Sequence, residues 1–338
     1  LDYFLISDPQ SIAYCTGYYN DPHERMFVFM ISKHGNHTLF MNDLFYLDHD
    51  LDVNIVWHKD GQDAIQTIVD EMHFPGRIGI DKNWASHFLL DLMKKLPDAK
   101  YINASPCVDL VRMKKDLQEQ VLMIESSKIN DAVMEEIIPF IQEGVTEKQL
   151  AKKLDELFFK HHSTCYGAIV AFGKNAADPH HENDDTLLRK GDCVLIDMGC
   201  VYKGYCSDMT RTFFYEGILE EEIKVYEIVK KANEAAEAMI KPGVKLSDID
   251  KCARKVISDE GYGKYFTHRL GHFIGRDVHE YGDVSSVNEM EVEEGMIFSI
   301  EPGIYLEGNF GVRVEDLVMV TKDGCQVLNS FTKDIYII

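Results

Sequence analysis

Several features that define other classes of protein are missing from this sequence. No apolar run approaches the ~20 residues that cross a bilayer. Basic residues are scarce, because 35 Lys and Arg stand against 57 Asp and Glu and leave a formal net charge of −22. Phosphate backbones and anionic lipids repel a chain this acidic, so we expect no nucleic acid and no membrane as partner.

Cysteine usage excludes a further class. The eight cysteines form no CxxC pair and follow no spacing typical of a disulfide framework. We therefore expect reduced thiols and a cytoplasmic location. The chain begins without Met, inside a segment typical of a first strand, and we expect its N-terminus to be trimmed.

The pattern of apolar residues changes near residue 110. Before it, short apolar strands alternate with amphipathic stretches, which predicts a small α/β domain over residues 1–110. After it, long hairpins alternate with helical patterns, one of them over 116–141 with Pro139 shortening its last turns. Another helix is predicted to start at a capping box formed by Thr146 and Gln149. Residues 111–338 therefore predict an α+β domain with a curved antiparallel sheet backed by helices.

Two aspartates interrupt an otherwise apolar hairpin, "CVLIDMGCVYKGYCSDMTRTFF", residues 193–214. Carboxylates are depleted in strands, and like charges opposite each other destabilise a sheet. A two-residue turn at Tyr202-Lys203 would place Asp197 and Asp208 directly opposite, with Cβ atoms about 4.5–5.5 Å apart. A single Asp in a hairpin is more often a solvated or turn residue, but a facing pair calls for a reason.

A second hairpin, "SIEPGIYLEGNFGVRVEDLV", repeats the arrangement with glutamates. A loop at residues 307–309 would pair Glu301 with Glu315. Four anions in one region would either have strongly raised pKa values or need cations, and two divalent ions would balance their charge. His272 lies beside Gly271, which lets the backbone approach closely, and adds an imidazole. This oxygen-rich set with one imidazole favours Mn²⁺, Co²⁺ or Zn²⁺.

The blocks "LIDMG", "SDMTRTF", "HRLGHFIG", "VHE", "SIEPGIY" and "GVRVED" resemble those of the metallopeptidase clan with the pita-bread fold. That clan includes methionine aminopeptidase, aminopeptidase P and prolidase. The opening segment resembles the creatinase-like N-terminal domain of its proline-specific branch. The resemblance implies a pita-bread domain over residues 111–338, with Asp208 and Glu315 bridging two metal ions. It assigns as metal ligands Asp197, Asp208, His272, Glu301 and Glu315.

Within this clan the chain resembles bacterial Xaa-Pro dipeptidases, which implies hydrolysis of Xaa-Pro bonds through a metal-bridging hydroxide. Mn²⁺ is the foremost candidate metal, with Co²⁺ or Zn²⁺ as alternatives. Glu301 would also pass a proton to the leaving proline nitrogen. His180 and His279 match the family's active-site histidines, whereas His181 has no match and is expected at the surface. The resemblance further implies a small peptide substrate with proline at P1′ and a homodimer.

Strand alternation adds two residues without appeal to the family. Tyr305 and Arg313 share a face with the carboxylates, and Arg313 would either stabilise them or contact substrate. Arg276 departs from the family pattern, in which many relatives have an aliphatic residue. Because a guanidinium suits a free C-terminal carboxylate, Arg276 is predicted as the substrate's carboxylate anchor, with a solvated side chain as the alternative.

Other functions remain open for a chain of this kind. Aminopeptidase P would use the same centre on longer peptides, and the ligands alone do not separate it from a dipeptidase. Creatine hydrolysis does not require the metal ligands, and a non-catalytic binding module would have lost some of them. All five ligands are present, which argues against these two alternatives.

Overall fold

The computed structural model describes residues 1–338 except 48 and 74. The described residues divide into two compact units, Leu1–Val111 and Arg112–Ile338. The first is α/β and the second α+β. No helix in the described part of the chain is both long and apolar enough to span a membrane.

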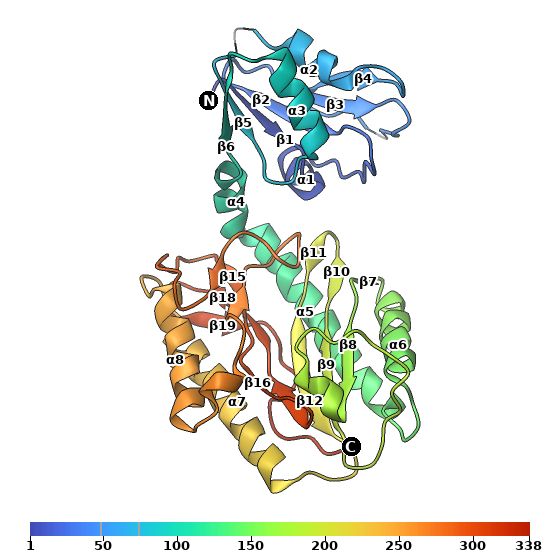
Figure 1. Cartoon of the computed structure of the whole chain (residues 1–338), viewed down its shortest axis with the longest axis vertical. Helices are drawn as coiled ribbons and strands as arrows, with labels where there is room; N and C mark the ends of the chain where they lie inside the picture. Colours follow the sequence, from blue (N-terminus) through green and yellow to red (C-terminus); the bar gives the residue numbers. More distant parts are fainter. Residues whose placement is uncertain (48, 74) are drawn as a thin grey trace. The chain divides into compact units, whose positions relative to one another are not determined.

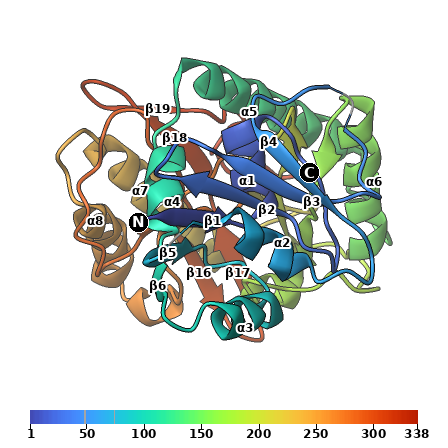
Figure 2. The same ribbon diagram turned by 90° about the horizontal axis from the view of Figure 1, so that it is seen from above.

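The smaller unit is built on one mixed sheet of six strands, in the order β4-β3-β2-β1-β5-β6 (Figure 2). Strands β1, β2 and β3 pair antiparallel, and the outer pairs β3-β4, β1-β5 and β5-β6 are parallel. The strands are β1 Tyr3–Ile6, β2 Val28–Ser32, β3 Thr38–Asn42, β4 Asn54–His58, β5 Arg77–Ile80 and β6 Lys100–Asn103.

Helices cover both faces of this sheet, so its central strands are apolar throughout. Residues of β1 alternate between two cores, with Leu5 on one side and Phe4 on the other. The first core includes Leu92 of α3, and the second includes Ile12 of α1. The helices are α1 Pro9–Thr16, α2 Ala64–Glu71 and α3 Ser86–Lys95.

The larger unit holds antiparallel strand pairs between helices, with α6 and α8 on opposite flanks in Figure 1. Helix α4, Pro106–Met113, spans the boundary between the two units in the sequence. The main helices of the larger unit are α5 Leu117–Ile137, α6 Glu147–Lys160, α7 Glu220–Met239 and α8 Leu246–Asp259. Both predicted helix ends are confirmed. Pro139 lies in a 3₁₀ turn, η1 Ile138–Phe140, that ends α5, and the Thr146–Gln149 capping box opens α6. Two further 3₁₀ turns are η2 Gly173–Ala177 and η3 Gly263–Tyr265.

Its strands form two successive sets, one after each helix pair. After α5 and α6 come β7 Thr164–Cys165, β8 Ile169–Phe172, β9 Cys193–Met198, β10 Cys200–Tyr202, β11 Tyr205–Cys206 and β12 Met209–Phe214. After α7 and α8 come β13 Gly271–His272, β14 Asp283–Val284, β15 Ile297–Ile300, β16 Gly303–Leu306, β17 Phe310–Arg313, β18 Asp316–Val320 and β19 Cys325–Val327.

The register predicted for the first hairpin is wrong, because the turn lies one residue further along the chain than expected. The turn is Lys203-Gly204, with φ of 49° and 83°, and Asp197 pairs with Thr210. Asp208 lies outside the ladder, between β11 and β12. A tight hairpin turn of this type needs positive φ at both central residues, and Gly204 meets that need where Tyr202 would be strained.

The register predicted for the second hairpin is confirmed on both sides of its glutamates. Gly303 pairs with Arg313, and Ile300 pairs with Asp316. Between those pairs the ladder opens, and the two glutamates bond to other segments. The backbone N–H of Glu301 donates to the Leu270 carbonyl at 2.8 Å. The N–H of Glu315 donates to the Thr210 carbonyl at 3.1 Å, which joins the second hairpin to the first.

Candidate metal centre

A cavity of about 590 Å³ in the larger unit gathers most of the predicted site residues. All five predicted ligands line it, together with both predicted histidines and one arginine: Asp197, Asp208, His272, Glu301, Glu315, His180, His279 and Arg313. Tyr305 lies behind this lining, and Arg276 lies elsewhere. The two hairpins therefore converge on one hollow.

A fully buried cluster of possible ligand atoms comes from Asp208, His272 and Glu315. One atom from each lies within 4.8 Å of the other two, and all three residues are buried. His272 Nε2 also lies 3.6 Å from Glu301 Oε1. Gly271 makes this approach possible, because a Cβ there would lie 1.9 Å from the Ser299 carbonyl oxygen.

Burial and mutual repulsion make these carboxylates hard to ionise on their own. Burial raises the pKa of Asp208, and raises that of Glu315 far above its usual range, with the other carboxylates adding to the effect. Burial likewise raises the pKa of Glu301 to about 7. A divalent cation reverses this effect, since it favours the charged carboxylates. Hard oxygen donors with one imidazole thus fit a divalent metal.

Hydroxyl groups hold the glutamates in place. Thr210 Oγ1 donates to Glu315 Oε2 at 2.7 Å, and Ser299 Oγ donates to Glu301 Oε1 at 3.2 Å. Ser299 Oγ also accepts the backbone N–H of His272 at 3.0 Å. Thr210 was not predicted, although its position two residues after Asp208 puts it on the same face of the strand.

Arg313 is buried in the lining of the cavity, where it contacts a carboxylate and two hydroxyl groups. Its Nη2 donates to Asp197 Oδ2 at 2.6 Å, and its Nη1 donates to the Tyr305 hydroxyl at 3.0 Å. The same hydroxyl lies 2.8 Å from His268 Nε2. Of the two roles predicted for Arg313, these contacts favour stabilising the acidic cluster.

Several residues that line the cavity were not predicted, among them His268 and Tyr166. Burial, and after it the charge of Arg313, lower the pKa of His268 to about 4, so this ring is neutral at pH 7. It belongs to the same "THRLGH" block as His272, which was the available signal. The hydroxyl of Tyr166 donates to the Ser207 carbonyl at 2.8 Å. No motif in the sequence points to Tyr166.

His180 and His279 are exposed at the cavity wall. The ring of His279 lies 4.3 Å from that of His272, centroid to centroid. Desolvation, and after it the neighbouring His272, lower the pKa of His279 to about 4. His279 is therefore a neutral imidazole that can donate one hydrogen bond.

The expectation that His181 lies at the surface is wrong. Its side chain is only 12% exposed, and its Nε2 lies 2.6 Å from Oε2 of the buried Glu147. Glu147 also accepts the backbone N–H of Phe172 and of Asp184. Since the Glu147 oxygens are already occupied, this group anchors the loop of His180 rather than offering a metal site.

Arg276 does not reach the cavity. Its guanidinium lies over the ring of Tyr205, 5.6 Å from the centroid, beside the turn of the first hairpin. This placement gives no support to its predicted role as a carboxylate anchor. Arg269, by contrast, lines the cavity, although the sequence analysis did not single it out.

Comparison with known proteins agrees with this geometry. Residues 121–322 match metallopeptidase family M24, and residues 1–114 match the creatinase/prolidase N-terminal domain. The chain belongs to metallopeptidase family M24. The predicted fold is confirmed: a creatinase-type α/β domain precedes a pita-bread catalytic domain.

Three relatives illustrate the range of similar proteins. An uncharacterized peptidase of Staphylococcus aureus is 35% identical over 97% of this chain and 94% of its own. The prolidase of Thermococcus sibiricus has a TM-score of 0.94 at 32% identity, covering 100% of this chain and 95% of its own. The X-Pro aminopeptidase of Thermotoga maritima has a TM-score of 0.87 at 30% identity, covering 100% and 98%.

Proposed function

We propose that this metallopeptidase is an Xaa-Pro dipeptidase that uses two divalent metal ions, Mn²⁺ foremost. The observation that carries the proposal is the buried cluster of Asp208, His272 and Glu315, with ligand atoms within 4.8 Å of one another at the floor of a cavity. Asp197 and Glu301 would complete the ligand set. When bound, such ions polarise the peptide carbonyl and lower the pKa of the attacking water.

The protein's own groups would handle the proton and the peptide. Glu301 lies at the edge of the cluster, where its carboxyl can pass a proton to the proline nitrogen as the bond breaks. His180 and His279 project into the cavity from its exposed wall and would donate hydrogen bonds to the oxygens of the peptide. The secondary amine of proline must be protonated on leaving, so Glu301 is the residue we expect to matter most.

A dipeptide also presents a free carboxylate, and Arg269 is the residue we propose for it. The permanently charged cations that line the cavity are Arg269 and Arg313. Arg313 already binds Asp197 and Tyr305, whereas Arg269 is exposed and forms no ion pair among the described residues. A guanidinium at the cavity wall suits a carboxylate through two parallel hydrogen bonds.

Aminopeptidase P activity is the second candidate, because the X-Pro aminopeptidase of Thermotoga maritima is similar over the whole chain. For this activity, the space beside Arg269 would have to accept the peptide chain that follows proline instead of a free carboxylate. A homodimer and a cytoplasmic location are part of the proposal, and all eight cysteines being free thiols is compatible with a reducing compartment.

The test is hydrolysis by metal-free protein before and after addition of Mn²⁺, Co²⁺ or Zn²⁺. The panel contains Ala-Pro, Ala-Pro-Phe and Ala-Ala. We expect metal-dependent cleavage of Ala-Pro, slower cleavage of Ala-Pro-Phe and none of Ala-Ala. Faster cleavage of Ala-Pro-Phe would favour aminopeptidase P, and no cleavage with any metal would remove the peptidase proposal.

A further inference from the structure

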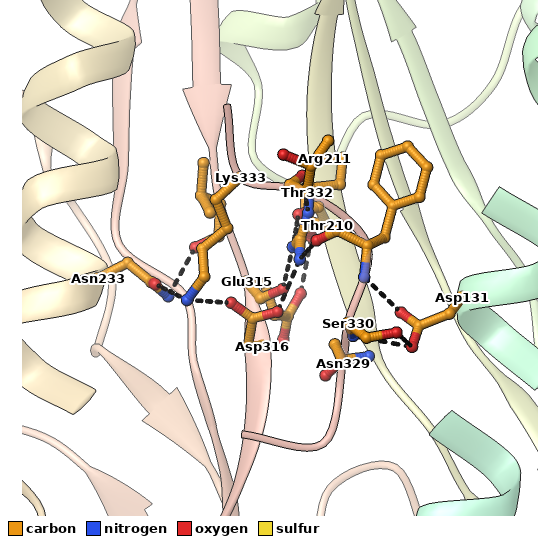
Figure 3. Close-up of polar contacts among 12 residues, drawn as sticks. Asp131, Thr210, Arg211, Asn233, Glu315, Asp316, Asn329, Ser330, Thr332 and Lys333 are labelled. Carbon is orange, nitrogen blue, oxygen red and sulfur yellow. Dashed lines mark hydrogen bonds and ion pairs between the residues drawn. The ribbon is translucent and has the colours of Figure 1, made fainter. Parts of the chain in front are cut away.

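A C-terminal segment crosses behind both ligand-bearing hairpins of the larger unit. We call residues 329–333 the brace; Figure 3 shows it between Asn233 of α7 and Asp131 of α5. It follows β19 and has no regular secondary structure. Its polar groups nevertheless have specific partners, and these partners lie next to the proposed metal ligands.

One end of the brace is fixed to α5 by a single buried carboxylate. Asp131 Oδ2 accepts the backbone N–H of Ser330 at 2.8 Å and its hydroxyl at 2.7 Å. Asp131 Oδ1 accepts the N–H of Phe331 at 3.1 Å. This anchor belongs to the helix that packs on the first set of strands.

The other end is fixed to α7 and to the second hairpin. Lys333 Nζ donates to Asn233 Oδ1 at 2.7 Å and lies 2.8 Å from Asp316 Oδ2. Asn233 Nδ2 in turn donates to the carbonyl of Ile300 at 2.9 Å. Ile300 directly precedes Glu301, so this chain of contacts ends beside a proposed ligand.

Arg211, which is 1% exposed, contacts both hairpins. Its Nη1 donates to the carbonyl of Thr210 at 2.9 Å and to that of Glu315 at 2.6 Å. Thr210 belongs to the first hairpin and Glu315 to the second. One guanidinium nitrogen therefore bridges the two strands where a proposed ligand lies, beside the backbone hydrogen bond from Glu315 to Thr210.

The remaining N–H groups of Arg211 bind the brace and the side chain of Asp316. Nη2 donates to the Phe331 carbonyl and to Asp316 Oδ1, both at 2.8 Å. Nε donates to the Thr332 carbonyl at 3.0 Å. All five N–H groups of Arg211 have an acceptor, which fixes the guanidinium in one orientation.

Asn329 connects the brace to Asp208, one of the two carboxylates proposed to bridge the metal ions. Its Nδ2 donates to the carbonyl of Asp208 at 3.3 Å, and its Oδ1 accepts the N–H of Leu317 at 2.7 Å. Asp208 lies outside the β-ladder, so its backbone lacks the strand pairing that would otherwise hold it. The brace supplies a contact at that point.

We propose that the brace, through Arg211, is a positioning element of the metal centre. Asn329 of the brace contacts the backbone of Asp208 directly, and the brace partners Asn233 and Arg211 contact the backbone next to Glu301 and at Glu315. Three of the four proposed carboxylate ligands are reached in this way. A buried ionic network is weak evidence for stability alone, because desolvation offsets most of its attraction. Its value here is geometric: it sets the separation of Asp208 and Glu315. The inference rests on the proposed ligand set and not on which peptide is cleaved.

The experiment compares Arg211→Lys and Lys333→Met with the wild type. Metal-free protein is titrated with Mn²⁺ by calorimetry, and the visible absorption of the Co²⁺ form reports ligand geometry. We expect both ions to bind the wild type, and the variants to bind at least one ion about 10- to 100-fold more weakly. We also expect an altered Co²⁺ spectrum in each variant.

Lys230→Ala is the matched control, since Lys230 pairs at the surface with Asp334, the residue that follows the brace. It should leave both affinities and the spectrum unchanged. Lys333→Met is the milder variant should Arg211→Lys fail to fold. Variants that melt earlier in the metal-free state yet bind both ions as the wild type does would overturn the inference, as would a wild type that binds no ion. Loss of Xaa-Pro cleavage in a wild type that still binds both ions would remove only the peptidase proposal.

Discussion

The two ligand-bearing hairpins of the larger unit hold their carboxylates in different ways. In the first, Asp197 lies in the central strand of a three-stranded sheet and pairs with residues on both sides. The other aspartate of this hairpin, Asp208, lies outside the ladder. In the second, both Glu301 and Glu315 interrupt the ladder, and their backbone N–H groups bond to Leu270 and Thr210.

The difference shows which contacts position the carboxylates of the proposed metal centre. Asp197 is placed by regular strand pairing, which any sequence of suitable pattern can provide. The three irregular carboxylates depend on contacts from other segments, including Thr210 and the C-terminal brace. We therefore expect the irregular positions to be more sensitive to changes in their surroundings than Asp197 is.

The largest expected effect comes from removing, in each hairpin, the carboxylate that is proposed to bridge the two metal ions. Asp208→Asn and Glu315→Gln keep the shape of the side chain and remove its charge. Each should lower kcat/KM for Ala-Pro by about 10³-fold or more, because a metal contributes several kcal/mol to the transition state. Metal content by atomic emission checks the cause. An Asp208→Asn enzyme with two tightly bound ions and near-normal activity would contradict the bridging role proposed for Asp208.

Two arginines distinguish the surroundings of the hairpins. Arg276 lies on Tyr205 beside the turn of the first hairpin, whereas Arg269 lines the cavity next to Leu270, which holds the second. Arg269→Ala should raise KM for dipeptides about 10- to 100-fold, the effect of a lost charge-assisted hydrogen bond. Arg276→Ala should leave KM unchanged. The opposite result would restore the role predicted for Arg276 from its sequence position.

Two threonines on the same strand offer a finer test. Thr210 Oγ1 donates to the Glu315 carboxylate, while Thr212 Oγ1 donates to the backbone carbonyl of Arg313 at 3.0 Å. Thr210→Val should weaken metal binding about 10-fold, as loss of an outer contact to a ligand does. Thr212→Val should lower the free energy of unfolding by about 1–3 kcal/mol and leave metal affinity intact. Equal metal affinities in the two variants would contradict the role given to Thr210.

The register of the second hairpin and the two-part fold were predicted from the sequence, because these follow from local pattern and loop length. The set of metal ligands stays a prediction. The first turn was misplaced, since both Tyr202-Lys203 and Lys203-Gly204 are compatible with the alternation of the strands. Only the need for positive φ at both central positions separates them. Tyr166 and the brace could not be predicted from the sequence, since long-range packing brings them to the site, whereas His268 lies in the same sequence block as His272 and was overlooked. The orientation of Arg276 depends on the same packing.

The turns themselves give the smallest expected effect and the sharpest comparison of the two hairpins. Gly204 has φ of 83° and Gly308 has φ of 76°, so both are left-handed residues in tight loops. Replacing either by Ala should cost about 1–2 kcal/mol of unfolding free energy, measured by urea denaturation of the metal-free protein. Because Glu301 and Glu315 are held by Leu270 and Thr210 rather than by their own loop, Gly308→Ala should not change metal affinity. Gly204→Ala should act in the same way, since two further strand pairs separate that turn from Asp208. A change of metal affinity in one variant alone would show that one turn, and not the contacts around the carboxylates, sets the position of its ligands.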